Sequence, residues 1–233
     1  EAAPGRPWKR FAGPAAAFAA LAALSWTLFA PGRDALELPF ADHDALTLDA
    51  AGGVIAARGL RVERAGPDGT VTRLADLDRP ARSLSWSEDG LYGADGTPAL
   101  LRWRAAGERP DRFVLDHAPL AVFAANGTIW TQDAAGGIRQ FLLNRSMTGV
   151  YLQPLDLAAL PGGPVGPFAV DADGTLLAID AAGALRRFAH SNGAYAAPRA
   201  GRSYGTGASL VPAPAGARVL VPRAEGAALI KPL

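Results

Sequence analysis

The sequence predicts one membrane-spanning helix followed by a single all-β domain. Three observations lead to this prediction. Residues 11–30 contain no charged side chain. After them, short apolar runs alternate with Gly, Asp, Asn and Pro, and no long stretch has the periodicity of a helix. The apolar runs also return at a regular spacing along the chain.

Composition permits one domain with a substantial core. The chain has 233 residues, of which 49% are hydrophobic, so two full domains are not expected. Its 23 basic and 22 acidic residues are spread along the chain, which argues against a nucleic-acid partner. The sequence has no cysteine and three histidines, so it excludes disulfides and thiolate metal sites. We expect no cofactor, because the Gly-rich segments lack the strand-to-helix setting of a phosphate loop.

The predicted anchor divides the chain into three parts. Residues 1–10 form a basic N-terminal segment, residues 11–30 the transmembrane helix and residues 31–233 the β domain. Twenty helical residues span roughly 30 Å, the thickness of the hydrocarbon core. Basic residues precede the helix, so the positive-inside rule places the N-terminus in the cytoplasm and the domain in the periplasm of a bacterial inner membrane. The expected interfacial anchors are Trp8, Lys9, Arg10, Trp26 and Phe29.

A cleaved signal peptide is the alternative interpretation of the same basic-then-apolar order. Leu28 is too large for the small-residue site before a cut after Ala30, and Pro31 would follow that cut. A retained anchor is therefore favoured. Nine of the 20 residues in the helix are alanine, which would allow close packing against helices of other subunits, although genome composition explains the alanines equally well.

A strand–turn–strand pattern occurs five times after the anchor. Its turn glycines are 37, 37, 47 and 42 residues apart. Three of them follow Asp or Asn, the pairs favoured in tight hairpins. The five turn glycines are Gly53, Gly90, Gly127, Gly174 and Gly216.

Each copy continues into a third strand, and the first four copies into a more variable fourth strand. The third strand carries an aliphatic residue, a basic residue and a larger apolar residue, so alternation should separate the basic side chain from its apolar neighbours. The fourth strands are expected near residues 70–74, 112–115, 150–155 and 194–197.

Units of about 40 residues with four strands resemble the blades of a β-propeller of the WD-repeat, PQQ-repeat or NHL kind, although the signature residues of those families are missing. The resemblance covers roughly residues 35–233 and implies five blades. The last copy ends after its third strand. We expect residues 35–40 to supply its outer strand and close the ring, which would remove exposed sheet edges.

Few residues suggest chemistry. Asp49 and Asp171 occupy matching positions at the ends of the first and fourth inner strands, where a channel site could form, but both also suit hairpin turns. The three histidines, His43, His117 and His190, fall at different positions of the repeat, which argues against a metal triad.

The recurring arginines of the third strands offer a second, weaker possibility. They could form a basic docking surface, or they could be solvated side chains whose stems cover apolar surface. These arginines are Arg61, Arg102, Arg139 and Arg186.

The sequence therefore favours a non-enzymatic scaffold or accessory subunit of a larger inner-membrane complex. Its expected partners are the lipid bilayer and other subunits of that complex, contacted through the helix and through propeller loops at residues 160–167 and 198–207. The alternative is an anchored periplasmic hydrolase or lactonase, or a ligand-binding sensor, that uses the propeller channel.

Overall fold

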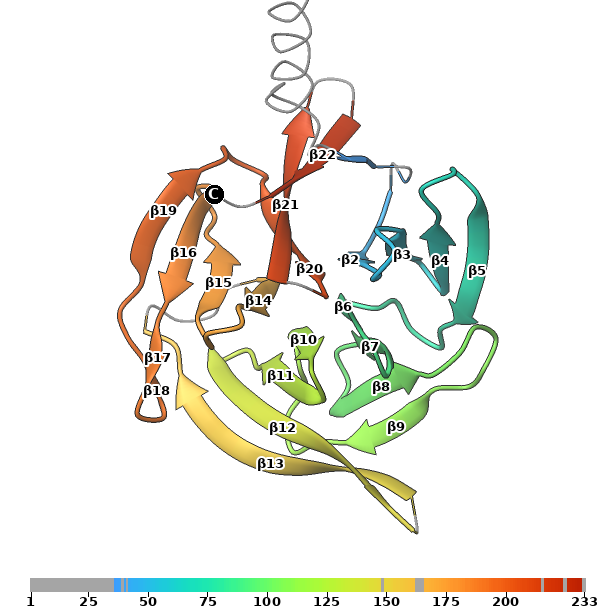
Figure 1. Ribbon diagram of the computed structural model, residues 1–233, viewed down its shortest axis with the longest axis horizontal. Helices are drawn as coiled ribbons and strands as arrows, with labels where there is room; N and C mark the ends of the chain where they lie inside the picture. The colour runs from blue at the N-terminus through green and yellow to red at the C-terminus, as the bar shows by residue number, and fades with distance from the viewer. Residues whose placement is uncertain are drawn as a thin grey trace, which may run out of the picture. The chain divides into compact units, whose positions relative to one another are not determined.

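Five antiparallel sheets of four strands each surround a common centre (Figure 1). The computed structural model describes residues 36–38, 40, 42–147, 149–161, 166–214, 216–223 and 226–231. This arrangement is a five-bladed β-propeller, as the repeat predicted.

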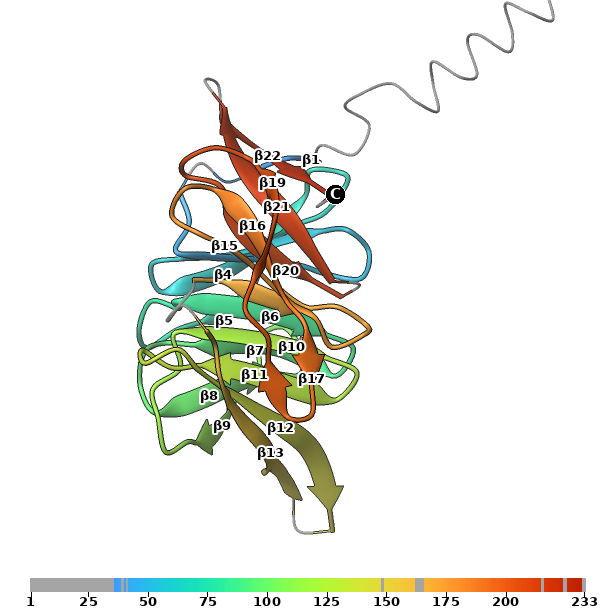
Figure 2. The same cartoon turned by 90° about the vertical axis from the view of Figure 1, so that its left-hand side faces the viewer.

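The first three blades follow the repeat in order, from the innermost strand outward. Blade 1 contains β2 (Ala45–Leu48), β3 (Val54–Arg58), β4 (Arg61–Ala65) and β5 (Val71–Asp76). Blade 2 contains β6 (Ser83–Ser87), β7 (Gly90–Ala94), β8 (Ala99–Trp103) and β9 (Asp111–Val114). Blade 3 contains β10 (Ala121–Ala125), β11 (Thr128–Gln132), β12 (Gly137–Ser146) and β13 (Gly149–Ala159). The long β12–β13 hairpin projects beyond the other blades (Figure 2).

Blade 4 differs from the expected pattern at its outer edge. It contains β14 (Phe168–Val170), β15 (Leu176–Ile179), β16 (Ala184–Phe188) and β19 (Arg199–Ser203). The expected outer strand near residues 194–197 is wrong, because β17 (His190–Ser191) and β18 (Ala194–Tyr195) form a small hairpin of their own. The segment 198–207, expected to be a loop, therefore contains the outer strand.

The N-terminal segment closes the ring, as predicted. Blade 5 contains β20 (Ser209–Ala213), β21 (Gly216–Arg223) and β22 (Gly226–Ile230), and β1 (Leu36–Glu37) adds its outer strand. Leu36 is paired with Leu229 and Glu37 with Ala228, in antiparallel register. The first and last segments of the propeller thus share one sheet, and β22 has a partner on both sides.

Asn-Gly pairs make two of the tightest turns. Asn126 and Gly127 join β10 to β11 with φ angles of 51° and 73°, and Asn192 and Gly193 join β17 to β18 with 52° and 75°. Two consecutive positive φ angles are typical of the type I′ turn, whose twist matches that of the flanking strands.

The core lies between neighbouring blades, where the faces of the sheets meet. Ile55, Val62, Leu84 and Trp103 are among the buried side chains between blades 1 and 2. Between blades 3 and 4, the rings of Phe123 and Phe168 lie 6.4 Å apart. These contacts stabilise the ring by burial of apolar surface.

Hydroxyl groups join the innermost strands of adjacent blades. Thr47 of β2 donates to the carbonyl of Pro212 in β20 at 3.0 Å and accepts from the amide of Trp86 in β6 at 3.1 Å. Ser85 of β6 accepts from the amide of Ala124 in β10 at 2.9 Å. Strand edges facing the centre have no further strand to pair with, so these hydroxyls satisfy backbone groups that would otherwise be buried without partners.

The predicted anchor lies outside the described residues, and so do Trp8, Lys9, Arg10, Trp26 and Phe29. Within the described part of the chain, no helix has the length and apolar character needed to span a bilayer.

Candidate functional site

A small cavity lies where the innermost strands begin. It has a volume of about 90 Å³ and is lined by residues of four blades. We define the channel mouth as the polar residues that line it: His43, Asp44, Arg82, Ser83 and Ser209. The neighbouring hydroxyl contacts join early residues of one inner strand to early residues of the next, as Ser83 does with Val122 at 3.0 Å. The strands therefore begin on the same side of the ring, and the segments before them converge there.

His43 precedes β2 and is half-buried at this mouth. Burial lowers the pKa of its imidazole, because desolvation disfavours the charged form; the nearby carboxylates of Asp44 and Asp42 act in the opposite direction. Its Nδ1 atom is buried, and no hydrogen-bond partner for it occurs among the described residues. The neutral imidazole is thus favoured near neutral pH, which suits a general base.

The turn after β3 fixes the carboxylate beside His43. Asp44 accepts a hydrogen bond from the amide of Gly59 at 2.7 Å, and its own amide donates to Ala57 at 2.8 Å. A larger, open groove of about 610 Å³ adjoins the same two residues, His43 and Asp44. His43 therefore lies between the cavity at the centre and a groove open to solvent.

Arg82 supplies positive charge at the mouth. Arg82 is exposed and directly precedes β6. Its side chain lies over Gly96, since a Cβ atom on Gly96 would be 2.7 Å from the Nε atom of Arg82. Its guanidinium makes no hydrogen bond or ion pair with any residue that the structure describes. A free cation in the same cavity as a neutral imidazole can stabilise negative charge that develops on a substrate.

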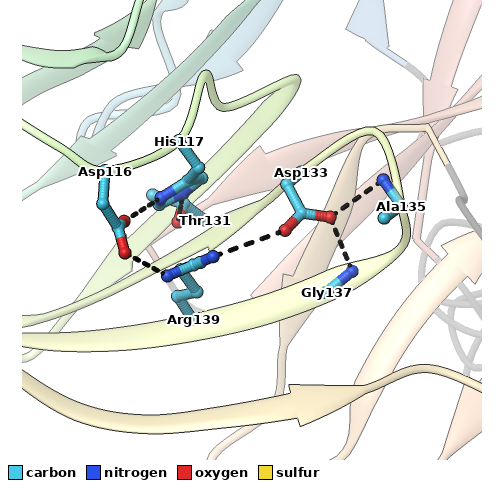
Figure 3. A network of polar contacts seen from close by, with 7 residues as sticks. All are labelled: Asp116, His117, Thr131, Asp133, Ala135, Gly137 and Arg139. Carbon is cyan, nitrogen blue, oxygen red and sulfur yellow. Dashed lines mark hydrogen bonds and ion pairs between the residues drawn. The ribbon is translucent and has the colours of Figure 1, made fainter.

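A second polar network lies on blade 3 (Figure 3). His117 Nε2 lies 2.8 Å from Thr131 Oγ1, and its Nδ1 lies 2.9 Å from the carboxylate of Asp116. Arg139 donates to Asp116 at 2.6 Å and reaches Asp133 at 3.9 Å. Hydrogen bonds from His117 and the charge of Arg139 lower the pKa of Asp116.

The order hydroxyl, imidazole, carboxylate is that of a nucleophile with its base. However, the side chain of Thr131 is fully buried, so a substrate could not reach its hydroxyl. The ring of His117 is stacked on Phe141 at 6.3 Å. We therefore interpret this network as a clamp that fixes the segment before β10.

An Asp-Ala-Ala-Gly turn occurs at residues 49–52, 133–136 and 180–183. Asp49 accepts from the amides of Ala51 and Gly53, both at 2.8 Å, and also from Arg64. Asp180 makes the same pattern of contacts, including one from Arg186 at 2.7 Å. Each carboxylate stabilises its own turn.

The structure places the two channel aspartates in different environments. Asp49 is buried in the turn contacts just described, whereas Asp171 is exposed. Burial of part of its carboxyl group, together with the charge of Asp173, raises the pKa of Asp171. In the described part of the chain, no group of three or more His, Asp or Glu side chains is positioned to hold a metal ion.

The four recurring arginines have different surroundings. Arg61 is exposed, and Arg139 and Arg186 pair with the turn aspartates. Arg102 is only 1% exposed, and its Nε donates to the carbonyl of Asp89 at 3.2 Å. The side chains thus do not share one solvated face.

Sequence reasoning did not single out His43 as a base or Arg82 as a cation. Both stand immediately before an innermost strand, His43 before β2 and Arg82 before β6. That position in the repeat was the available signal, because loops that precede inner strands meet at the centre of the ring. The Asp-Ala-Ala-Gly repetition was likewise visible in the sequence.

No protein-family model matches the chain, and no curated protein matches its sequence. Solved structures resemble it. A gluconolactonase from Xanthomonas campestris has a TM-score of 0.56 and 18% identity, over 81% of this chain and 71% of that one. A putative gluconolactonase has a TM-score of 0.52 and 16% identity, over 79% and 72%. A glutaminyl cyclase from Myxococcus xanthus has a TM-score of 0.53 and 12% identity, over 84% and 94%.

These comparisons contradict the expectation of a non-enzymatic scaffold or accessory subunit. The similar structures reported above carry the names of enzymes. The expectation relied on the scarcity of acidic residues along the inner strands, but the loops before those strands can build a site without them. At this level of identity the likeness itself shows the fold.

Proposed function

We propose that this protein is a hydrolase that opens a small lactone or ester at the channel mouth, with His43 as the general base. One observation carries the proposal. His43 lines the central cavity together with Arg82, which has no partner in the part of the chain that the structure describes, and burial favours the neutral imidazole of His43. The likeness in fold to a gluconolactonase supports the same reaction class.

In the proposed reaction, the imidazole of His43 takes a proton from a water molecule as that water attacks the carbonyl carbon of the substrate. The carbonyl double bond becomes a single bond, and its oxygen acquires negative charge. The carboxylates of Asp42 and Asp44 favour the imidazolium that forms, since both raise the pKa of His43.

Arg82 would offset the charge on the tetrahedral oxyanion. When the oxyanion collapses, the bond to the ring oxygen breaks, and the proton held by His43 passes to that leaving oxygen. The product is the open hydroxy acid, and the base returns to its neutral form.

The space available favours a small substrate. The central cavity of about 90 Å³ is smaller than most ligand sites, but the adjoining groove adds about 610 Å³. A compact lactone could place its carbonyl at the cavity and any substituent in the groove. Ser83 Oγ is engaged with the backbone of β10, so we assign it no catalytic step.

The test compares a His43→Gln variant with the unchanged protein. Hydrolysis of glucono-δ-lactone, γ-butyrolactone and dihydrocoumarin is followed by acid release in a pH-stat. Loss of a general base should lower kcat/KM by about 100-fold or more on any lactone that the unchanged protein accepts.

His190→Gln is the matched control, because His190 is exposed and lies on β17, away from the residues of the mouth. It should retain full activity. Full activity of the His43→Gln variant, with thermal unfolding unchanged, would refute His43 as the base. No hydrolysis of any lactone or ester by the unchanged protein would refute the reaction class.

We also propose that residues 11–30 anchor the enzyme in the bacterial inner membrane, with the propeller in the periplasm. Support comes from the uncharged run and from the basic residues that precede it. Fusions of alkaline phosphatase and of green fluorescent protein to the C-terminus test this topology. The phosphatase fusion should be active and the fluorescent fusion dark; the reverse pattern would overturn the proposal.

A further inference from the structure

A groove separates the outer parts of blades 1 and 2. It has a volume of about 750 Å³, within the range of small-molecule sites. Strand β5 and the segment after it form one wall, and β8, β9 and the connection between them form the other. The amide of Gly107 donates to the carbonyl of Leu74 at 2.7 Å, which ties the two walls together at one point.

The floor of the groove is apolar. Leu77, Leu101 and Trp103 line it and are each less than 10% exposed. Gly93 makes room for the indole, since a Cβ atom there would lie 2.9 Å from the six-membered ring of Trp103. The indole Nε1 is buried, and no acceptor for it occurs among the described residues. Buried indole N–H groups usually have a hydrogen-bond acceptor, so the N–H of Trp103 could still donate to a ligand beside the floor.

The rim is charged, with four arginines and four acidic residues. Three of the acids are engaged: Asp76 with Arg73, Glu108 with Arg104, and Asp95 with Thr97. Two of the arginines are therefore engaged: Arg73 pairs with Asp76, and Arg112 donates to the hydroxyl of Thr97 at 3.1 Å.

Two arginines of the rim have no such partner. The side chains of Arg79 and Arg109 make no hydrogen bond or ion pair with the residues that the structure describes, and neither does the carboxylate of Asp78. The unengaged groups of the rim therefore carry two positive charges and one negative charge. This balance suits a ligand with a single negative charge.

We infer that this groove binds an amphiphilic organic carboxylate, with its apolar body on the Trp103 floor and its carboxylate at Arg79 and Arg109. Arginine fits a carboxylate because its planar fork donates two parallel hydrogen bonds. The apolar floor would bind the body of the ligand, and Arg79 and Arg109 would bind its carboxylate. This groove has no lining residue in common with the channel mouth, and the inference does not depend on the proposed hydrolysis.

Phenylbutyrate is the probe, because it joins an apolar ring to one carboxylate. Isothermal titration calorimetry with the full chain in a non-ionic detergent should show saturable binding. Arg79→Ala and Arg109→Ala should each weaken binding by about tenfold, as expected for loss of a charge-assisted contact. Both side chains are exposed, so the fold should survive, and thermal unfolding checks this.

The controls separate this site from general affinity for apolar anions. Arg199→Ala removes an exposed arginine on blade 4 and should leave binding unchanged. Phenylbutyramide, the neutral amide, should bind at least about tenfold more weakly than the carboxylate. Absence of saturable binding, equal binding of the amide, or equal binding by the Arg79 and Arg109 variants would each overturn the inference.

Discussion

Replacing Thr47 by valine should destabilise the propeller strongly although it preserves the shape of the side chain. Thr47 is fully buried, and its hydroxyl serves blade 5 through Pro212 and blade 2 through Trp86. Valine would leave one backbone acceptor and one backbone donor buried without partners. At about 1–3 kcal/mol for each unsatisfied group, we expect a loss of about 2–6 kcal/mol in the free energy of unfolding.

Ser85→Ala is the matched comparison, because it leaves only the amide of Ala124 without its partner. It should cost about half as much as the Thr47 variant. Urea unfolding followed by tryptophan fluorescence measures both, with an unchanged slope on denaturant as evidence that the unfolded states are comparable. A loss below about 1 kcal/mol for Thr47→Val, or a loss smaller than that of Ser85→Ala, would refute the idea that the hydroxyls join the blades.

Three further predictions concern the turns, the closure and the mouth. The free energy of unfolding of Gly90→Ala, measured in urea, should be about 1–3 kcal/mol lower than that of Gly127→Ala. A Cβ atom at Gly90 would lie 2.6 Å from the carbonyl oxygen of Trp103, whereas no atom lies within 4 Å of a Cβ atom at Gly127. Removing residues 1–38 should lower the melting temperature and cause self-association in light scattering, while removing residues 1–30 should do neither, since only the first deletion takes away β1. Burial lowers the pKa of His43 in the folded state, so the contribution of His43 to the free energy of unfolding is present above about pH 6.5 and is lost as the pH falls. The melting temperature of His43→Gln, measured by calorimetry, should lack this part of the pH dependence.

The repeat made most of the fold predictable. Turn chemistry is local, so pairs such as Asn126-Gly127 identify hairpins without knowledge of the rest of the chain. The closing strand could be predicted because the last copy lacks an outer strand. Blade 4 shows the limit: Asn192-Gly193 is an equally strong local signal, but it forms an extra hairpin and displaces the outer strand to Arg199–Ser203.

Side-chain environments were harder to predict, since they depend on contacts between blades. Arg102 resembles the other arginines in sequence, but it is buried in β8, where its Nε reaches the carbonyl of Asp89. His43 and Arg82 are 39 positions apart, and they share a cavity because each lies just before the innermost strand of one of two neighbouring blades. Their matching position in the repeat indicated that convergence, but not the burial that lowers the pKa of His43.

The dependence of kcat/KM on pH tests whether His43 is the general base. For a lactone that the protein hydrolyses, kcat/KM should rise about tenfold per pH unit at low pH. It should level off at an apparent pKa below about 6.5, the ordinary value for histidine, because burial lowers the pKa of His43. The residual activity of His43→Gln should lack this rise. A profile without a rise between about pH 4 and about pH 7, or the same rise in the His43→Gln variant, would rule out His43 as the general base.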